Sequence, residues 1–243
     1  MKIHESYLEI LDGFYEPITD YAKARAYQRG QIVWAYPVYP LVAERIYGLK
    51  MKTEDDDHED FRLHSFSIKR VKHLRDFREL KRGRPIKDLK LGTDEYLLVM
   101  KAKKRPAIFW NKVIMRWADG TEADYSLLIP IFGIDKEYQD TIFKTACFDY
   151  KESFYIPACN DYTTKDGAAH FEKTQIFPMK YIEPFGGNLN PVPGVLLNEM
   201  VMWVFYKHWC DFWNCCVNDE DKKDEQDIRD IIREELVKKV GSN

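Results

Sequence analysis

The stretch PAIFWNKVIMRWADGTEADYSLLIPIF, residues 106–132, decides the fold. Three apolar and aromatic runs lie within it, at 106–110, 113–117 and 125–132, and an Asp-Gly pair at 119–120 separates the last two. β-Branched and aromatic residues favour strands, whereas an Asp-Gly pair favours a tight turn. The stretch therefore predicts short strands joined by tight turns.

Runs of the same kind continue this pattern on both sides. They occupy residues 31–36, 96–101, 154–157 and 174–177. Many short strands with tight turns between them are typical of a small β-barrel or sandwich. The sequence thus predicts a mainly β protein of the α+β class.

Segments whose apolar residues follow a helical period flank this β region on both sides. Residues 3–28 carry two apolar stripes with Pro17 between them, which predicts two short helices. Residues 195–216 are apolar around most of a helix, and residues 228–236 carry a single apolar stripe. These two segments predict a helix pair at the C-terminal end.

Changes in composition mark the boundaries of the parts. Residues 184–194, PFGGNLNPVPG, are rich in turn-forming residues and predict a linker. Residues 41–92 are charged and lack a sustained period, which indicates an insertion. We therefore divide the chain into an N-terminal helical extension (1–28), a β region that carries the insertion (29–183), and a linker with the helix pair (184–243).

The net charge of -3 conceals a basic segment at residues 61–90, which holds eleven Lys and Arg residues against three acids. Such a segment can follow a phosphate backbone, because each contact releases counterions. Its candidate RNA contacts are Lys69, Arg70 and Lys72. The alternative is a solvated helix with ion pairs between successive turns.

Several common classes of site lack their motifs in this sequence. The chain has no Gly-rich phosphate loop, no His-Glu-x-x-His pair and no nucleophile elbow. The spacing of His208, Cys210, Cys215 and Cys216 does not match a structural zinc site, so free thiols in a reducing compartment are expected. We expect no metal and no cofactor.

Two segments bear on localisation. The first residues, MKIHE, do not lead into the apolar region of a secretion signal. Polar residues interrupt 195–217 too often for a membrane span. A cytoplasmic protein that does not enter a membrane is expected.

Four pieces of the β region resemble, in chain order, the strands of one known family. They are Arg29-Gly30-Gln31-Ile32-Val33-Trp34, Lys104-Arg105-Pro106-Ala107-Ile108-Phe109, Leu127-Leu128-Ile129-Pro130-Ile131-Phe132 and Lys173-Thr174-Gln175-Ile176-Phe177-Pro178. Each is similar to a strand of the MazF/PemK toxins, which are the growth inhibitors of type II toxin–antitoxin systems. The insertion after Pro40 and the helices at both ends depart from the family pattern.

The resemblance implies an SH3-like barrel that forms a homodimer, binds single-stranded RNA in a groove and cleaves it without a metal. It also implies a protein antitoxin as a partner. Arg105 stands at the position of the family's catalytic arginine, and a guanidinium grips phosphate oxygens in two places. Lys104 and Lys136 are further candidate RNA contacts. The alternative for Arg105 is a strand-start arginine that pairs with a neighbouring acid.

Phe132 stands where the family usually has a catalytic threonine or serine. A phenyl ring cannot exchange a proton or bind a phosphate by hydrogen bonds. Ser126 or Lys136 is the candidate substitute. Enzymatic activity is therefore left open: the chain is an endoribonuclease, a catalytically inactive module that binds RNA or a protein, or a structural subunit of an intracellular assembly.

For the aromatic residues and one histidine, the sequence allows both a structural and a functional interpretation. Trp110, Trp117 and Tyr125 are expected in the core, with base stacking as the alternative. His170 is expected in a loop, either without a role or as an acid or base. The aromatic run at 203–213 is expected to pack against the barrel or a second subunit.

Overall fold

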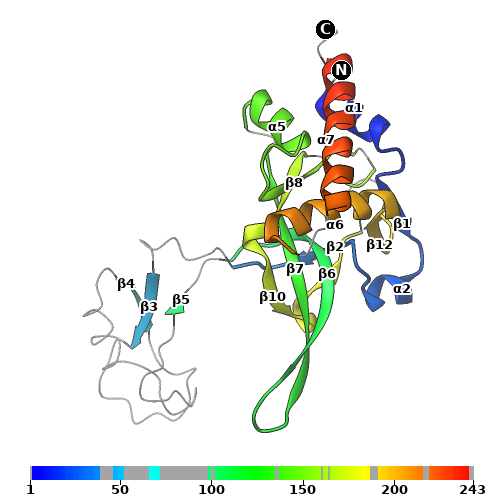
Figure 1. The fold of residues 1–243 in the computed structure, drawn as a ribbon. Coiled ribbons are helices and arrows are strands. Elements are labelled where there is room, and N and C mark those ends of the chain that lie inside the picture. Colours follow the sequence, from blue (N-terminus) through cyan, green and yellow to red (C-terminus); the bar gives the residue numbers. More distant parts are fainter. Residues whose placement is uncertain are drawn as a thin grey trace. The chain divides into compact units, whose positions relative to one another are not determined.

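The computed structural model describes residues 2–38, 46–51, 66–71, 98–99, 102–134, 137–159, 161–163, 165–186, 191–215 and 219–240. The chain forms two compact units, one of residues 1–37 with 104–243 and the other of residues 38–103. The larger unit is a mixed α+β structure built on an antiparallel sheet (Figure 1).

The sheet of the larger unit follows the order β1-β12-β2-β6-β7-β9-β8, while β10 pairs with β7 and β11 pairs with β2. Its strands are β1 (Tyr15–Ile18), β2 (Gln31–Ala35), β6 (Arg105–Arg116), β7 (Glu122–Gly133), β8 (Ser153–Ile156), β9 (Gly167–His170), β10 (Gln175–Pro178), β11 (Glu183–Pro184) and β12 (Gly194–Leu197). The predicted strands at 31–36, 125–132, 154–157 and 174–177 correspond to β2, β7, β8 and β10, whereas those predicted at 106–110 and 113–117 form the single strand β6.

The expected SH3-like barrel is not confirmed, because the sheet does not close on itself. The two strands that flank the short 3-10 helix η3 (Met179–Tyr181) have different partners: β10 pairs with β7 and β11 pairs with β2. The coarser prediction of an α+β protein with a large antiparallel sheet is confirmed.

Pro17 lies inside β1, between the helices α1 (Ile3–Ile10) and α2 (Tyr21–Ala26). The sequence predicted the two helices but not the strand between them. β1 is at the end of the sheet and pairs with β12 alone within the described region. A proline is tolerated there, because the open side of an edge strand needs no backbone donor.

The remaining helices are α5 (Gln139–Ala146), α6 (Glu199–Trp213) and α7 (Asp219–Val240), and η2 (Phe171–Lys173) is a second short 3-10 helix. α6 and α7 form the predicted helix pair. The Asn198 side chain caps the start of α6 by accepting a hydrogen bond from the Val201 amide at 2.7 Å, and Asn214 ends it in the left-handed conformation. α7 packs on both α6 and α1 (Figure 1).

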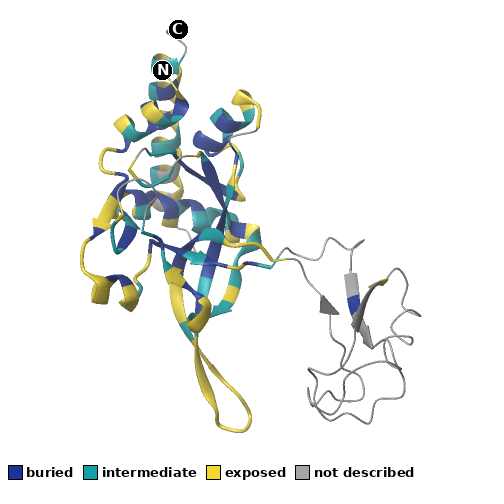
Figure 2. Ribbon diagram, turned by 180° about the vertical axis from the view of Figure 1, so that it is seen from behind, coloured by how far each residue is buried: buried dark blue, intermediate teal, exposed yellow. Residues whose placement is uncertain are grey.

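One large core lies between the sheet and the helices of this unit. Phe205 of α6 is fully buried and its ring contacts Trp110, Phe154 and Phe171, which come from three different elements of the sheet region. Burial of such rings drives the docking of α6. The far ends of β6 and β7 extend away from this core as an exposed hairpin (Figure 2).

The smaller unit contains a three-stranded sheet in the order β4-β3-β5, formed by β3 (Ile46–Met51), β4 (Phe66–Val71) and β5 (Leu98–Val99). A bridge between Val38 and Ala102 joins the two ends of this unit. Apart from β4, most of the predicted basic segment lies outside the described residues.

Candidate functional site

The register of the sheet brings Arg105 and Phe132 together. β6 and β7 pair antiparallel with Ala107 opposite Pro130, so the same register places Arg105, two residues earlier, opposite Phe132, two residues later. Cross-strand partners project from the same face of a sheet. The Cζ atom of Arg105 lies 4.6 Å from the centroid of the Phe132 ring.

On its other side, β7 pairs with β9, where Phe132 is opposite Ala168. His170 is two residues further along β9 and therefore projects from the same face as Ala168 and Phe132. The ring of His170 meets the Phe132 ring edge to face, with 5.1 Å between the centroids. Phe132 thus has an arginine from β6 on one side and a histidine from β9 on the other.

Lys173 brings a second positive charge to the same ring. η2 follows β9 directly, and the Nζ atom of Lys173 lies 4.4 Å from the Phe132 ring centroid. A cation over an aromatic face is stabilised by about 0.5–1 kcal/mol at an exposed site. We call Arg105, Phe132, His170, Glu172 and Lys173 the Phe132 cluster.

Glu172 orients the histidine of the Phe132 cluster. Its Oε1 atom lies 3.0 Å from Nδ1 of His170 and 3.3 Å from Nζ of Lys173. The Nζ atom of Lys173 also lies 3.4 Å from this Nδ1. A carboxylate only accepts hydrogen bonds, so the contact with Glu172 uses the tautomer of His170 that carries its proton on Nδ1. Burial lowers the pKa of His170 below its ordinary value, and the Lys173 charge lowers it further.

This arrangement can bind an anion and exchange a proton. Arg105 and Lys173 bring two cations to the Phe132 ring, and Glu172 brings a carboxylate beside them. The side chains of His170 and Lys173 are 22% and 27% exposed, so a ligand in solution can reach both. Arginine and lysine side chains are the usual partners of phosphate oxygens.

Lys104, a neighbour of Arg105, has a different environment. Its Nζ donates a hydrogen bond of 2.9 Å to Oε2 of Glu183 on β11, and this bond raises the pKa of the Lys104 ammonium. The same Nζ lies 5.5 Å from the centroid of the Trp34 ring. Successive residues of a strand project to opposite faces, which separates Lys104 from the Phe132 cluster.

The other predicted RNA contacts lie in the smaller unit or outside the described residues. Arg70 is exposed on β4 of the smaller unit, and Lys69 lies beside it on the same strand. Lys72 and Lys136 lie outside the described residues.

Ser126 cannot replace the missing hydroxyl of Phe132. It is fully buried in β7, and its Oγ donates a hydrogen bond of 3.0 Å to the carbonyl of Phe177. Of the two candidate substitutes, only Lys136 remains. His170 is in β9 and not in a loop as predicted, and the signal that could have indicated its role is the short motif His-Phe-Glu-Lys at 170–173.

The three candidate stacking residues divide into two groups. Trp110 is buried at a bulge of β6, where Arg29 donates a hydrogen bond of 3.2 Å to its carbonyl and covers its ring. The core reading of Trp110 is therefore confirmed. Trp117 is 44% exposed on the hairpin, with its ring centroid 6.0 Å from that of Tyr125, so the core reading was wrong for Trp117.

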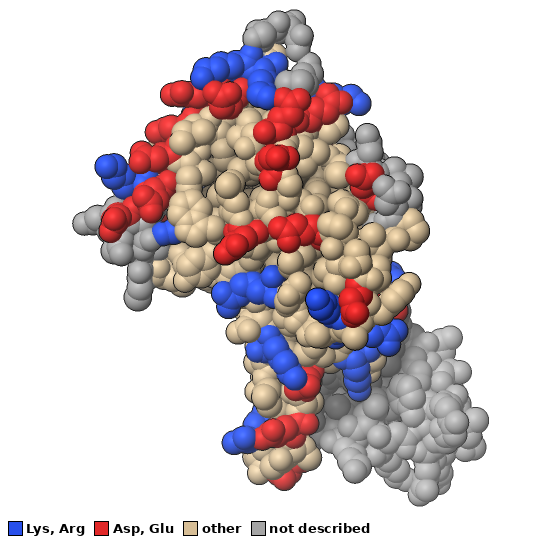
Figure 3. Space-filling model, turned by 90° about the vertical axis from the view of Figure 1, so that its right-hand side faces the viewer, with Lys and Arg blue, Asp and Glu red and all other residues tan. Residues whose placement is uncertain are grey.

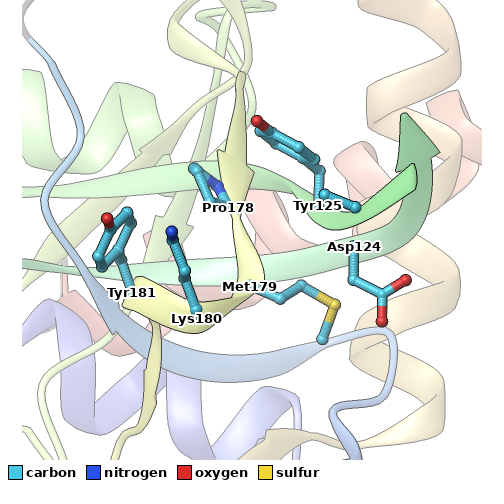
Figure 4. A pocket seen from close by; sticks show the side chains of 7 residues that line it. Asp124, Tyr125, Pro178, Met179, Lys180 and Tyr181 are labelled. Atoms are coloured by element: carbon cyan, nitrogen blue, oxygen red, sulfur yellow. The ribbon is translucent and has the colours of Figure 1, made fainter. Parts of the chain in front are cut away.

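An open pocket of about 650 Å³ lies between the hairpin and η3 (Figure 4). It is lined by Ala123, Asp124, Tyr125, Pro178, Met179, Lys180 and Tyr181. Basic and acidic side chains both lie on the hairpin in Figure 3. Lys112 and Asp124 of the hairpin form an ion pair at 2.8 Å. The hairpin therefore presents no purely basic surface on the face shown in Figure 3.

His208 and Cys210 lie in α6, and Cys215 follows it. His208 is buried, its Nε2 lies 3.1 Å from the Ser153 carbonyl and its Nδ1 lies 3.3 Å from a guanidinium nitrogen of Arg229. The Cys210 side chain is buried, whereas that of Cys215 is exposed. In the part of the chain that the structure describes, no group of three or more His, Cys, Asp or Glu side chains is placed to hold a metal ion.

The aromatic run of α6 faces the core on one side and solvent on the other. Phe205 is fully buried, whereas Trp203, Tyr206 and Trp213 are between 43% and 47% exposed. The expected packing against the sheet is confirmed for the buried side. Among the helices within the described ranges, none has the length and apolar character needed to cross a membrane.

Comparison with protein-family models, with curated proteins and with solved structures gives no significant match for this chain.

Proposed function

We propose that this chain is a MazF/PemK-like protein that acts on single-stranded RNA as a metal-independent endoribonuclease. The observation that carries the proposal is the approach of Arg105, Lys173 and His170 to one side chain, Phe132. Two cations and a neutral imidazole are the groups that cleavage of a phosphodiester needs when no metal takes part.

The strand pairing supports the SH3-like part of this proposal. The four sequence pieces that resemble the family lie at β2, β6, β7 and β10. These strands are hydrogen-bonded in the order β2-β6-β7-β10, all antiparallel. After η3 the chain returns to β2 as β11, as it would in a barrel that is nearly complete.

Cleavage without a metal uses the ribose 2′-OH as the nucleophile. In the proposed mechanism Arg105 and Lys173 hold the phosphate and stabilise the negative charge that grows on its oxygens in the transition state. Arg105 is half-buried and its Cζ is held over the Phe132 ring, so its position needs little rearrangement when RNA binds. On this proposal the chain forms a homodimer and inhibits growth in the cytoplasm unless a protein antitoxin binds it.

The test is incubation of the purified protein with mixed single-stranded RNA in excess EDTA. Fragments that end in 2′,3′-cyclic phosphate are expected, and Arg105→Ala should lower their rate of formation about 100-fold or more. Arg116→Ala is the matched control, because Arg116 is exposed at the far end of the same strand and pairs with Glu122. Fragments that form equally fast with Arg105→Ala, or that require a metal, contradict the proposal.

A second candidate function is a catalytically inactive module that binds RNA. Phe132 in place of a hydroxyl residue and the buried, hydrogen-bonded state of Ser126 favour it. In that case RNA remains intact in the assay and binds with an affinity that falls steeply with salt. If RNA neither binds nor is cleaved and a discrete complex with another protein is recovered, the structural-subunit function gains support.

A further inference from the structure

The position of His170 bears on which group accepts a proton at the Phe132 cluster. The inference drawn from it rests on the proposed function, and it concerns the proton transfer that Phe132 cannot perform. Phe132 has no exchangeable proton, and Ser126 is buried with its hydroxyl bonded to the Phe177 carbonyl. A cleaving site at this position therefore needs another group that accepts the proton of the 2′-OH.

We propose that His170 is the general base of the site, with Glu172 as the residue that positions it and Phe132 as the ring that fixes its distance from Arg105 and Lys173. His170 meets Phe132 edge to face at 5.1 Å between centroids, and both cations lie within 4.6 Å of the centroid of the same ring. All three groups therefore contact one ring, which places the imidazole and the two cations on neighbouring elements of one site.

The hydrogen bond to Glu172 fixes which nitrogen of His170 is free to act. In the tautomer that donates from Nδ1 to Oε1 of Glu172, across 3.0 Å, Nε2 is the nitrogen with a lone pair. In the described part of the chain, no side chain or carbonyl hydrogen-bonds to Nε2. A carboxylate that orients an imidazole through one nitrogen and leaves the other to accept a proton is a common arrangement in acid–base catalysis.

Burial disfavours the imidazolium form of His170 most, and the charge of Lys173 disfavours it further, while Glu172 and Glu152 favour it. Arg105 approaches from β6 across the Phe132 ring. Because the pKa of His170 is below its ordinary value, the base is in its reactive form above about pH 6.5.

The chemical step balances without a metal or a co-reactant. Nε2 of His170 takes the proton of the 2′-OH as O2′ forms a bond to phosphorus. The bond from phosphorus to O5′ breaks, its electron pair remains on O5′, and solvent water supplies the proton that O5′ gains. His170 then releases its proton to solvent, and the products are a 2′,3′-cyclic phosphate and a 5′-hydroxyl end.

The experiment combines three measurements on the full chain. The first is the rate of RNA cleavage in EDTA as a function of pH, for the wild type, His170→Ala, Glu172→Gln and Arg105→Ala. The second is the affinity for 2′-O-methyl RNA, which binds but has no nucleophile. The third is the rate of His170→Ala with added imidazole, and the thermal midpoint of each variant reports whether it is folded.

Three results are expected if His170 is the base. His170→Ala slows cleavage about 100-fold or more while its affinity for 2′-O-methyl RNA changes less than threefold. Added imidazole restores part of the rate, and Glu172→Gln slows cleavage about tenfold. The wild-type rate rises with pH below about pH 6.5 and then levels; Arg105→Ala keeps this shape, whereas His170→Ala loses it.

The contrary results are distinct from a failure of the proposed function. If His170→Ala is folded and cleaves as fast as the wild type, or if imidazole restores nothing, His170 is not the base although RNA cleavage stands. If the wild type binds 2′-O-methyl RNA but does not cleave RNA, the inference is overturned and the binding function remains. If the wild type does neither, both the inference and the proposed function are wrong.

Discussion

Arg105 and Phe132 lie opposite each other on β6 and β7, with the guanidinium carbon 4.6 Å from the ring centroid. In the proposed MazF/PemK-like function, Phe132 takes the position of a catalytic hydroxyl. Here its ring contacts two cations and a histidine. The residue that argues most strongly against the family's own route of catalysis is thus the residue around which the candidate site is arranged.

Replacing Phe132 by leucine tests this role of the ring. Phe132→Leu keeps an apolar side chain but removes the aromatic face that holds Arg105 and Lys173. Each cation–π contact is worth about 0.5–1 kcal/mol, so the affinity for 2′-O-methyl RNA should fall about tenfold. Phe177→Leu is the control, since Phe177 lies on the neighbouring strand β10 and its ring meets Tyr181. An affinity that falls equally in both variants would show that the ring of Phe132 does not position the cations.

A pair of buried tyrosines gives a test of the core. The rings of Tyr7 and Tyr155 meet edge to face at 4.9 Å, but only Tyr155 has a hydrogen bond for its hydroxyl, to Oδ1 of Asp166 at 2.7 Å. Among the described residues, the Tyr7 hydroxyl has no partner. Tyr155→Phe should lower the free energy of unfolding by about 1–2 kcal/mol, whereas Tyr7→Phe should leave it unchanged or raise it slightly. Urea unfolding measures both, and an equal loss in the two variants would contradict the assignment.

Alanine substitutions at two glycines with positive φ distinguish the cost of backbone strain from the cost of steric crowding. Gly30 (φ 87°) and Gly120 (φ 82°) both lie in the left-handed region. A Cβ at Gly30 would lie 2.6 Å from Sδ of Met202, whereas a Cβ at Gly120 would meet no atom within 4 Å. Gly120→Ala should therefore cost about 1 kcal/mol through its backbone alone.

Gly30→Ala should cost more, by about 1–3 kcal/mol, because the Met202 side chain must shift to make room for the added Cβ. Thermal or urea unfolding of the two variants gives the difference directly. If the two glycine variants lose the same free energy of unfolding, the Met202 side chain moves aside at no cost, and the loss in both comes from the backbone conformation.

Much of the sheet could be predicted from the sequence, because β2, β6, β7 and β10 carry the β-branched and aromatic runs that favour strands. β9 was not predicted, since its sequence Gly-Ala-Ala-His has neither β-branched residues nor alternation. β1 was missed for a related reason: Pro17 is read locally as a break, and only its place at the edge of the sheet makes it acceptable.

The candidate site could be predicted only in part. Arg105 and Phe132 were identified through the resemblance, but the approach of His170 and Lys173 depends on the pairing of β7 with β9, which no local pattern reveals. Lys104, adjacent to Arg105 in sequence, is instead bonded to Glu183 on β11, a strand that pairs with β2. The site therefore depends on which residues the sheet pairing brings together, and residues adjacent in sequence need not belong to it.

The cysteines should differ in reactivity with a thiol reagent. Burial raises the pKa of the Cys147 thiol to about 11, so at pH 8 it is protonated as well as inaccessible. Cys215 is exposed at the end of α6. In the native protein, mass spectrometry after brief alkylation at pH 8 should find Cys215 modified and Cys147 intact. Modification of both at similar rates would mean that the packing around Cys147 opens readily.

The docking of α7 can be tested by two residues of that helix. Leu236 is fully buried where α7 packs on α1 and α6, whereas Ile231 is 59% exposed on the same helix. Leu236→Ala should lower the free energy of unfolding by about 2–4 kcal/mol, because a buried leucine loses both its transfer free energy and its packing. Ile231→Ala should change it by less than about 0.5 kcal/mol, since little of its surface leaves water on folding and alanine favours helices.

The ion pair of Lys239 with Glu9, which joins α7 to α1 at the surface, should contribute less than the leucine, so Lys239→Ala serves as a second control. If Leu236→Ala is as stable as Ile231→Ala in urea unfolding, α7 does not belong to the cooperative core of this unit.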